Sequence, residues 1–241
     1  ANAASRIVPS MAGLYLLSAL TILMLSIDKI DDALNLIIQS AFGLGSFTGG
    51  AIGALIIGFQ RSAFSNEAGM GTASIAHSAV ETDEPISEGL VSLLEPFIDT
   101  MVICTLTSLV IITTLYTNDP SLGNLEGIAI TSAAFAFHID WFPVVLGIAA
   151  LLFAFSTAIA WAYYGLKSWT YIFGESRGSE LVFKMIFCLF VCLGCMIKLS
   201  AVLDFSDAMV FVIAVPNIIG LYLYAPEVKR DLKAYLARHR I

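Results

Sequence analysis

Residues Phe64–Val80, FSNEAGMGTASIAHSAV, combine several groups that could bind a small polar solute within an apolar region. Gly69 and Gly71 flank Met70, and a glycine costs a helix interior roughly 1 kcal/mol relative to alanine. The pair therefore predicts a break in the helix that begins in the small apolar run Gly45–Phe59. A break at membrane depth exposes backbone amides and carbonyls, with which secondary transporters bind small charged solutes. A glycine hinge with close helix packing is the alternative.

Two opposite charges, Arg61 and Glu67, lie six residues apart at this predicted break. Charges at membrane depth are costly and are rarely without a role. We expect them to make gating or structural contacts, with each other or with other helices, while direct substrate contact is the alternative. The amide of Asn66 could satisfy backbone groups beside the break. His77, further along, is either a packing residue or a proton carrier.

A second group of polar residues lies in LLFAFSTAIAWAYYG, where Ser156 and Thr157 are adjacent hydroxyls among apolar residues. Two hydroxyls beside a free carbonyl make a hard-oxygen site of the kind that sodium accepts. Trp161 follows Thr157 by four residues, hence on the same helix face, and its indole could enclose a small apolar side chain. The alternatives are hydroxyls bonded back to their own helix and an aromatic belt at the membrane surface.

The composition is that of a polytopic membrane protein. The chain of 241 residues is 58% hydrophobic and 13% charged, with a mean hydropathy of +0.86, whereas a soluble domain carries roughly 25% charge. No basic stripe indicates nucleic-acid binding. No nucleophile lies beside a general base in the sequence, so we do not expect an enzyme.

A helix that spans a bilayer needs about 20 apolar residues. The sequence predicts an all-α protein with about six membrane segments, one of them broken. These are Ile7–Ile27, the interrupted segment Phe47–Val80, Gly89–Tyr116, Trp141–Leu166, Leu181–Val202 and Met209–Tyr224, the last closed by Pro226 and a charged tail. Shorter helices are expected within Asp28–Gly45 and Ile128–Phe137, and a polar loop at Glu81–Glu88.

The lysines and arginines predict the orientation of these segments. With six spans, most of these cations fall on one side and only Lys29 and Lys198 on the other. The positive-inside rule then places both ends of the chain in the cytoplasm. The residues on the cytoplasmic side are Arg6, Lys167, Arg177, Lys184, Lys229, Arg230, Lys233, Arg238 and Arg240.

FSNEAGMGTASIAH resembles the signature of the alanine or glycine:cation symporters, the sodium:alanine symporter family. That family typically reads R-G-x-F-S-N-E-A-G-x-G-S-A-P-I-A-H. The resemblance continues in EGLVSLLEPFIDTMVICTLTSLVI, LFAFSTAIAWAYYG and VPNIIGLYLY, which follow in order at the expected spacing. It implies a LeuT-type fold of two inverted five-helix repeats, each beginning with a broken helix. Residues 1–241 would be the C-terminal portion of one transporter domain, comprising the last helix of the first repeat and the second repeat, with the upstream half absent.

The same resemblance implies roles for particular residues. Gly69, Met70 and Gly71 would be the unwound stretch that contacts the substrate, and Thr157 and Trp161 would be pocket residues of a scaffold helix. The hydroxyls of Ser156 and Thr157 would bind sodium, and the remaining ligands would be backbone carbonyls.

The expected function is sodium-coupled symport of small neutral amino acids, alanine or glycine, by alternating access in a bacterial-type cytoplasmic membrane. Sodium would be co-transported, and the bilayer and the missing N-terminal half would be the partners. Two alternatives stay open. One is proton coupling through Glu67 or His77; the other is a membrane sensor or assembly subunit that binds an amino acid without moving it.

Overall fold

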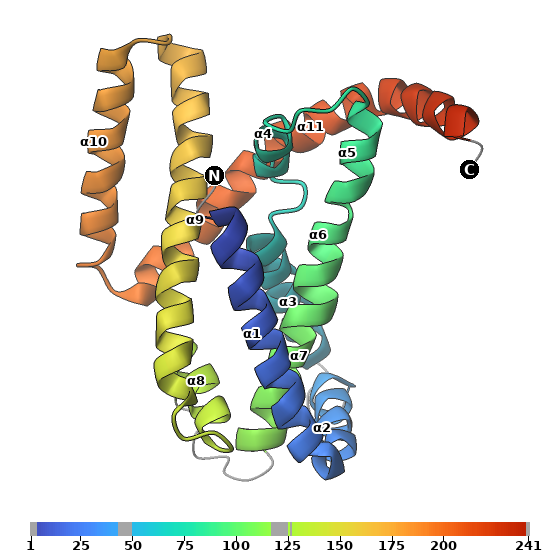
Figure 1. Ribbon diagram of the computed structural model, residues 1–241, viewed down its shortest axis with the longest axis vertical. Helices are drawn as coiled ribbons and strands as arrows, with labels where there is room; N and C mark the ends of the chain where they lie inside the picture. Colours follow the sequence, from blue (N-terminus) through green and yellow to red (C-terminus); the bar gives the residue numbers. More distant parts are fainter. Residues whose placement is uncertain (1–3, 43–49, 117–124, 126, 240–241) are drawn as a thin grey trace. The chain divides into compact units, whose positions relative to one another are not determined.

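The computed structural model describes residues 4–42, 50–116, 125 and 127–239, and every regular element in these residues is a helix (Figure 1). The parts of the expected elements at residues 43–49 and 117–124 lie outside the described residues. The helices are α1 (Ala4–Leu25), η1 (Ile27–Lys29), α2 (Ile30–Phe42), α3 (Gly50–Asn66), α4 (Thr72–His77), α5 (Pro85–Ser92), α6 (Leu94–Pro96), η3 (Phe97–Cys104), α7 (Thr105–Ile111), η4 (Ile112–Tyr116), α8 (Ile128–Ala136), α9 (Phe142–Phe173), α10 (Arg177–Gly194) and α11 (Leu199–His239).

Among the described residues, three helical stretches are long and apolar enough to cross a bilayer: Pro85–Tyr116, Phe142–Phe173 and Leu199–His239. Pro9–Leu25 and Ile27–Phe42 meet at a bend of 74° and make a fourth if the pair is one span. The multi-pass membrane character expected from the composition is therefore supported, with three or four candidate spans.

The helices form two compact units, one made of residues 1–58 with 99–159 and the other of residues 59–98 with 160–241. In the first unit, α1, α7, η4, α8 and the start of α9 enclose an apolar core. Phe135 is fully buried and stacks on Phe142, with ring centroids 4.5 Å apart. The core residues are Ala19, Ile22, Leu23, Val110, Leu115, Ala134, Phe135, Phe142 and Leu146.

Two polar contacts join helices of the first unit. The hydroxyls of Tyr15 on α1 and Thr107 on α7 lie 2.5 Å apart. The Ser26 hydroxyl, at the end of α1, lies 2.8 Å from Nε2 of His138, which follows α8. Each contact joins two segments of the first unit that lie about 90 or more residues apart in the sequence.

In the second unit, the end of α9 and α10 form an antiparallel pair (Figure 1). Gly174 makes the turn between them with φ +84°. Gly165 allows α9 and α10 to approach closely, because a Cβ at this position would lie 2.7 Å from the Phe183 ring. The Trp169 indole donates to the Ser179 hydroxyl at 2.9 Å. The pair is thus held by a small residue against an aromatic ring and by one polar contact.

Several predicted boundaries were wrong. The loop predicted at Glu81–Glu88 ends earlier, because Pro85 begins α5 at a position where its missing N–H costs nothing. The segment predicted at Leu181–Val202 is interrupted, since α10 ends at Gly194. The helix starting at Trp141 runs on past Leu166 to Phe173.

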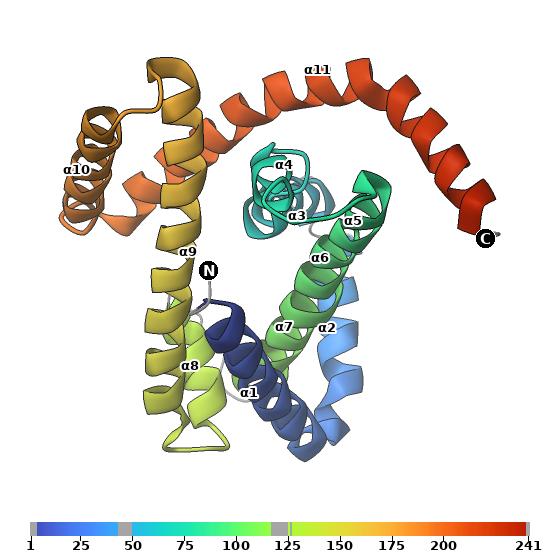
Figure 2. The same cartoon turned by 45° about the horizontal axis from the view of Figure 1, so that its top comes forward.

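Pro226 was predicted to end the last helix, but α11 continues through Pro216 and Pro226 for 41 residues. Figure 2 shows α11 as an arc, which is how a helix accommodates the hydrogen bonds that proline removes. The charged tail also favours helix, because it is rich in strong helix formers and pairs Glu227 with Arg230 at 3.6 Å. The tail is therefore an extension of the helix and not a separate segment.

Candidate functional site

The predicted interruption is present: α3 ends at Asn66 and α4 begins at Thr72. Gly69 and Gly71 have φ of +83° and +95°, and Glu67 has φ of +53°. This left-handed region is easy for glycine but rarely occupied by other residues. The two glycines therefore allow the chain to leave the helix and re-enter it within five residues.

Asn66 and a turn hold the break locally. The Asn66 side-chain oxygen accepts from the Ala68 amide at 2.9 Å, and its Nδ2 donates to the Ser62 hydroxyl at 3.2 Å. The Met70 amide donates to the Glu67 carbonyl at 3.1 Å. Met70 is only 2% exposed. The break is thus a defined turn with a buried side chain at its centre.

Glu67 and Trp161 contact each other directly. Trp161 lies on α9, and its Nε1–H donates to Oε1 of Glu67 at 3.0 Å. Sequence reasoning placed Trp161 in a substrate pocket and Glu67 among gating or structural charges, but did not connect them. The contact ties the left-handed residue Glu67 to the part of α9 that belongs to the second unit.

Arg61 pairs with a group on another helix, Asp207 of α11. The same Asp207 oxygen, Oδ2, accepts from Gln60 Nε2 at 2.5 Å. Asp207 is 5% exposed, and its Oδ1 has no hydrogen-bond partner among the described residues. The Arg61 side chain is 45% exposed. A buried carboxylate on α11 is thus compensated by two donors of α3.

Asn217, also on α11, reaches the break itself. Its Nδ2 donates to the Gly69 carbonyl at 2.7 Å. Its Oδ1 lies 3.2 Å from the position that a Cβ on Gly71 would occupy. Close by, the Thr72 hydroxyl is buried and has no hydrogen-bond partner in the described part of the chain.

Ser156 and Thr157 lie on α9, one turn before Trp161, in the part of that helix that belongs to the first unit. The Ser156 hydroxyl donates to the Phe153 carbonyl at 2.9 Å, so its proton is used within its own helix. Its lone pairs can still accept a cation. Thr157 is exposed.

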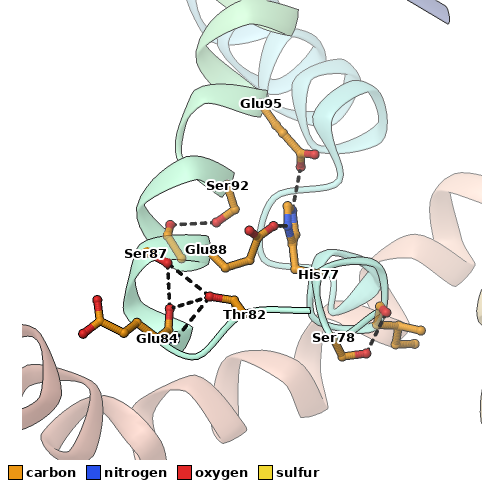
Figure 3. A network of polar contacts seen from close by, with 10 residues as sticks. His77, Ser78, Thr82, Glu84, Ser87, Glu88, Ser92 and Glu95 are labelled. Atoms are coloured by element: carbon orange, nitrogen blue, oxygen red, sulfur yellow. Dashed lines mark hydrogen bonds and ion pairs between the residues drawn. The ribbon is translucent and has the colours of Figure 1, made fainter. Parts of the chain in front are cut away.

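His77 joins α4 to the following helices (Figure 3). Its Nδ1 lies 2.6 Å from Oε1 of Glu88 on α5, and its Nε2 lies 3.3 Å from Oε2 of Glu95 on α6. The Glu88 contact has hydrogen-bond geometry, whereas Nε2 of His77 has no hydrogen-bond partner among the described residues. The three groups stand in ion-pair range, so a protonated His77 would compensate two carboxylates at the α4–α5 junction.

Sequence reasoning missed Asp207 and Asn217 as partners of the broken helix. Both carried a usable signal, because an acid and an amide within a long apolar run need partners there. What the sequence alone does not contain is which segment those partners come from.

The sequence profile of the sodium:alanine symporter family matches residues 1–241. The chain belongs to this family. It is 37% identical to the sodium/alanine symporter AgcS of Methanococcus maripaludis over 230 residues, which is 95% of the chain and 50% of AgcS. It is 36% identical to an uncharacterized transporter of Haemophilus influenzae, covering 100% of the chain and 53% of that protein. It is 33% identical to the "Probable sodium/glutamine symporter GlnT" of Bacillus subtilis, covering 98% of the chain and 49% of GlnT.

The chain therefore spans about half the length of the curated relatives it matches. No solved structure matches. The resemblance seen in the FSNEAGMG stretch is confirmed by the family match. Family members named by function are transporters and not enzymes, and the family name implies co-transport of sodium.

Proposed function

We propose that this chain forms part of a sodium-coupled symporter for small neutral amino acids, alanine or glycine. One observation carries the proposal: the break between α3 and α4 is centred on glycines in the left-handed conformation. Broken helices at mid-membrane offer backbone groups to a zwitterionic solute, which needs both donors and acceptors. Membership of the sodium:alanine symporter family supports the coupling ion.

The substrate would contact the break at Gly69, Met70 and Gly71. Its carboxylate would accept from backbone N–H groups at the start of α4, which have no partner within the helix. Thr157 and Trp161 would form the α9 wall of the pocket. Since Trp161 donates to Glu67, the indole would have a fixed orientation and would limit the size of the substrate side chain.

Sodium would bind the hydroxyl oxygens of Ser156 and Thr157, together with backbone carbonyls. Its charge would favour the outward-open, substrate-ready state, and its gradient would drive uptake. Arg61, Glu67 and Asn66 would have gating or structural roles and not contact the ion. This assignment uses the lone pairs of Ser156, since its proton is donated to Phe153.

We further propose the LeuT-type topology for this chain. In it, α1 is the last helix of a first repeat and α3–α4 is the broken first helix of the second repeat. Six membrane segments would place both ends of the chain in the cytoplasm. The other helices of the first repeat would lie in sequence upstream of this chain, in keeping with relatives of about twice its length.

Equilibrium binding tests the proposal without requiring transport. The protein expressed from the complete coding sequence would be purified in detergent and titrated with labelled alanine in sodium and in potassium. We expect saturable binding in sodium that weakens at least tenfold in potassium. Binding of equal strength in both would remove the sodium assignment, and no binding of alanine or glycine would remove the substrate assignment.

Proton coupling is a second candidate, favoured by the position of His77 between Glu88 and Glu95. In that case alanine uptake would follow a pH gradient without sodium, and His77→Gln would abolish it. Uptake that follows only sodium, and that survives His77→Gln, would exclude this candidate.

A further inference from the structure

Two local hydrogen bonds hold parts of the break: the Met70 amide donates to the Glu67 carbonyl at 3.1 Å, and the Ser74 hydroxyl donates to the Gly71 carbonyl at 2.7 Å. Neither bond involves the Gly69 carbonyl, and glycine populates left-handed and right-handed conformations about equally. Apart from Gly69 itself and its two chain neighbours, no described residue has an atom within 4 Å of the position of a Cβ on Gly69. A contact from outside the break to the Gly69 carbonyl would therefore add a restraint that these local bonds do not supply.

Asn217 supplies such a contact on both sides of Met70. Before Met70, its Nδ2 donates to the Gly69 carbonyl at 2.7 Å. After Met70, its side chain lies against Gly71, with Oδ1, Cγ and Cβ at 3.2, 3.3 and 3.4 Å from the position of a Cβ. One planar amide therefore restricts the chain at two points two residues apart.

The helix that carries Asn217 is itself fixed to α3. Asp207 lies ten residues before Asn217 on α11 and takes donors from Gln60 and Arg61 of α3. Ten residues are about 2.8 helical turns, so Asp207 and Asn217 lie about 15 Å apart along an ideal helix and about 80° apart around its axis. α11 thus contacts the broken helix before the break and within it.

We infer that Asn217 is a positioning residue, which holds the Gly69–Gly71 backbone in the orientation that the substrate meets. The expected effect of Asn217 on alanine binding rests on the proposed function. The restraint that Asn217 places on the break can be measured without substrate. Asn217 acts through Gly69 and Gly71 and is not itself assigned to contact the substrate.

The test compares Asn217→Ala and Asn217→Asp with the wild type in the complete protein. The aspartate variant keeps the size of the side chain and, when ionised, lacks a donor for the Gly69 carbonyl. Asn35→Ala, an exposed amide on α2, is the matched control. Amide hydrogen exchange of residues 67–72 is measured in sodium without alanine, and KM and kcat are measured for alanine uptake.

We expect both variants to speed exchange at residues 67–72 by about tenfold, as for the loss of one hydrogen bond, with exchange in α10 unchanged. KM for alanine should rise by a similar factor while kcat changes much less. Unchanged exchange at residues 67–72 in both variants would overturn the inference, as would a loss of kcat at constant KM. If wild type takes up no alanine, the proposed function fails, and the exchange comparison still decides whether Asn217 holds the break.

Discussion

At the residue scale, Trp161 is the side chain whose role in the proposed pocket is easiest to isolate. Trp161→Phe removes the donor to Glu67 and keeps a ring, so alanine binding should weaken by about tenfold or more, as for a hydrogen bond to a charged group.

Trp161→Ala should admit larger side chains or abolish binding. Trp169→Phe, which loses a similar bond to Ser179, is the control. Competition of labelled alanine with larger amino acids measures the effect, and unchanged selectivity in Trp161→Ala would count against a pocket role.

Thr157 tests the sodium site. Thr157→Ala removes one proposed oxygen ligand, so the sodium concentration for half-maximal uptake should rise about tenfold, equivalent to about 1.4 kcal/mol. Ser168→Ala is the control, since this α9 hydroxyl donates to the Tyr164 carbonyl and is not assigned to the site. If the sodium concentration for half-maximal uptake is the same in Thr157→Ala as in the control, Thr157 is not a sodium ligand.

Alanine substitutions at Gly69 and Gly71 distinguish the cost of backbone strain from the cost of side-chain crowding. Alanine at either position would have to adopt a left-handed conformation, which destabilises the folded state by roughly 1–2 kcal/mol. Only at Gly71 does the new Cβ also meet Asn217, at 3.2 Å. Gly71→Ala should therefore lower the thermal unfolding midpoint more than Gly69→Ala does. Equal midpoints would show that the Asn217 side chain moves aside.

At the element scale, the attachment of α3 to α11 depends on a buried charge. Arg61→Ala leaves the Asp207 carboxylate with Gln60 as its donor, and breaking a buried pair costs about 3–5 kcal/mol, less here because Arg61 is half exposed. Asp207→Asn added to Arg61→Ala should recover part of the loss, because the uncompensated charge is gone. The unfolding midpoints of the single and double variants measure this.

The control for this pair is Lys184→Ala. Lys184 pairs with Glu180 at 3.0 Å on the exposed surface of α10, and such pairs contribute at most about 1 kcal/mol. If Arg61→Ala and Lys184→Ala lower the midpoint equally, then the Asp207 pair does not hold α3 to α11.

The sequence predicted the local break in the helix but not the length of α11 or the long-range partners of the break. The break at Gly69 and Gly71 was predictable, because the conformational preference of glycine is local. The 41-residue length of α11 was not, since a proline signals an end that favourable flanking sequence can override by bending. The partners Asp207 and Asn217 could not be assigned, because they lie about 150 residues from the groups they bind. The hydroxyls of Ser156 and Thr157 remain a sequence-based proposal.

At the scale of the whole molecule, the chain supplies about half the length of the relatives it matches. The proposed cycle therefore belongs to the protein made from the complete coding sequence. Within this chain, the broken helix is restrained by a side chain from α9 and by side chains from α11. We expect α9 and α11 to determine how the break responds to the proposed binding of sodium and substrate.

Uptake of labelled alanine into sealed vesicles containing the complete protein tests the central claim most directly. An inward sodium gradient is compared with the same gradient of potassium. The account predicts accumulation above the equilibrium level with sodium and none with potassium, and collapse of the accumulation when the sodium gradient is dissipated. Equal uptake with both ions, or no accumulation with either, would contradict sodium-coupled symport.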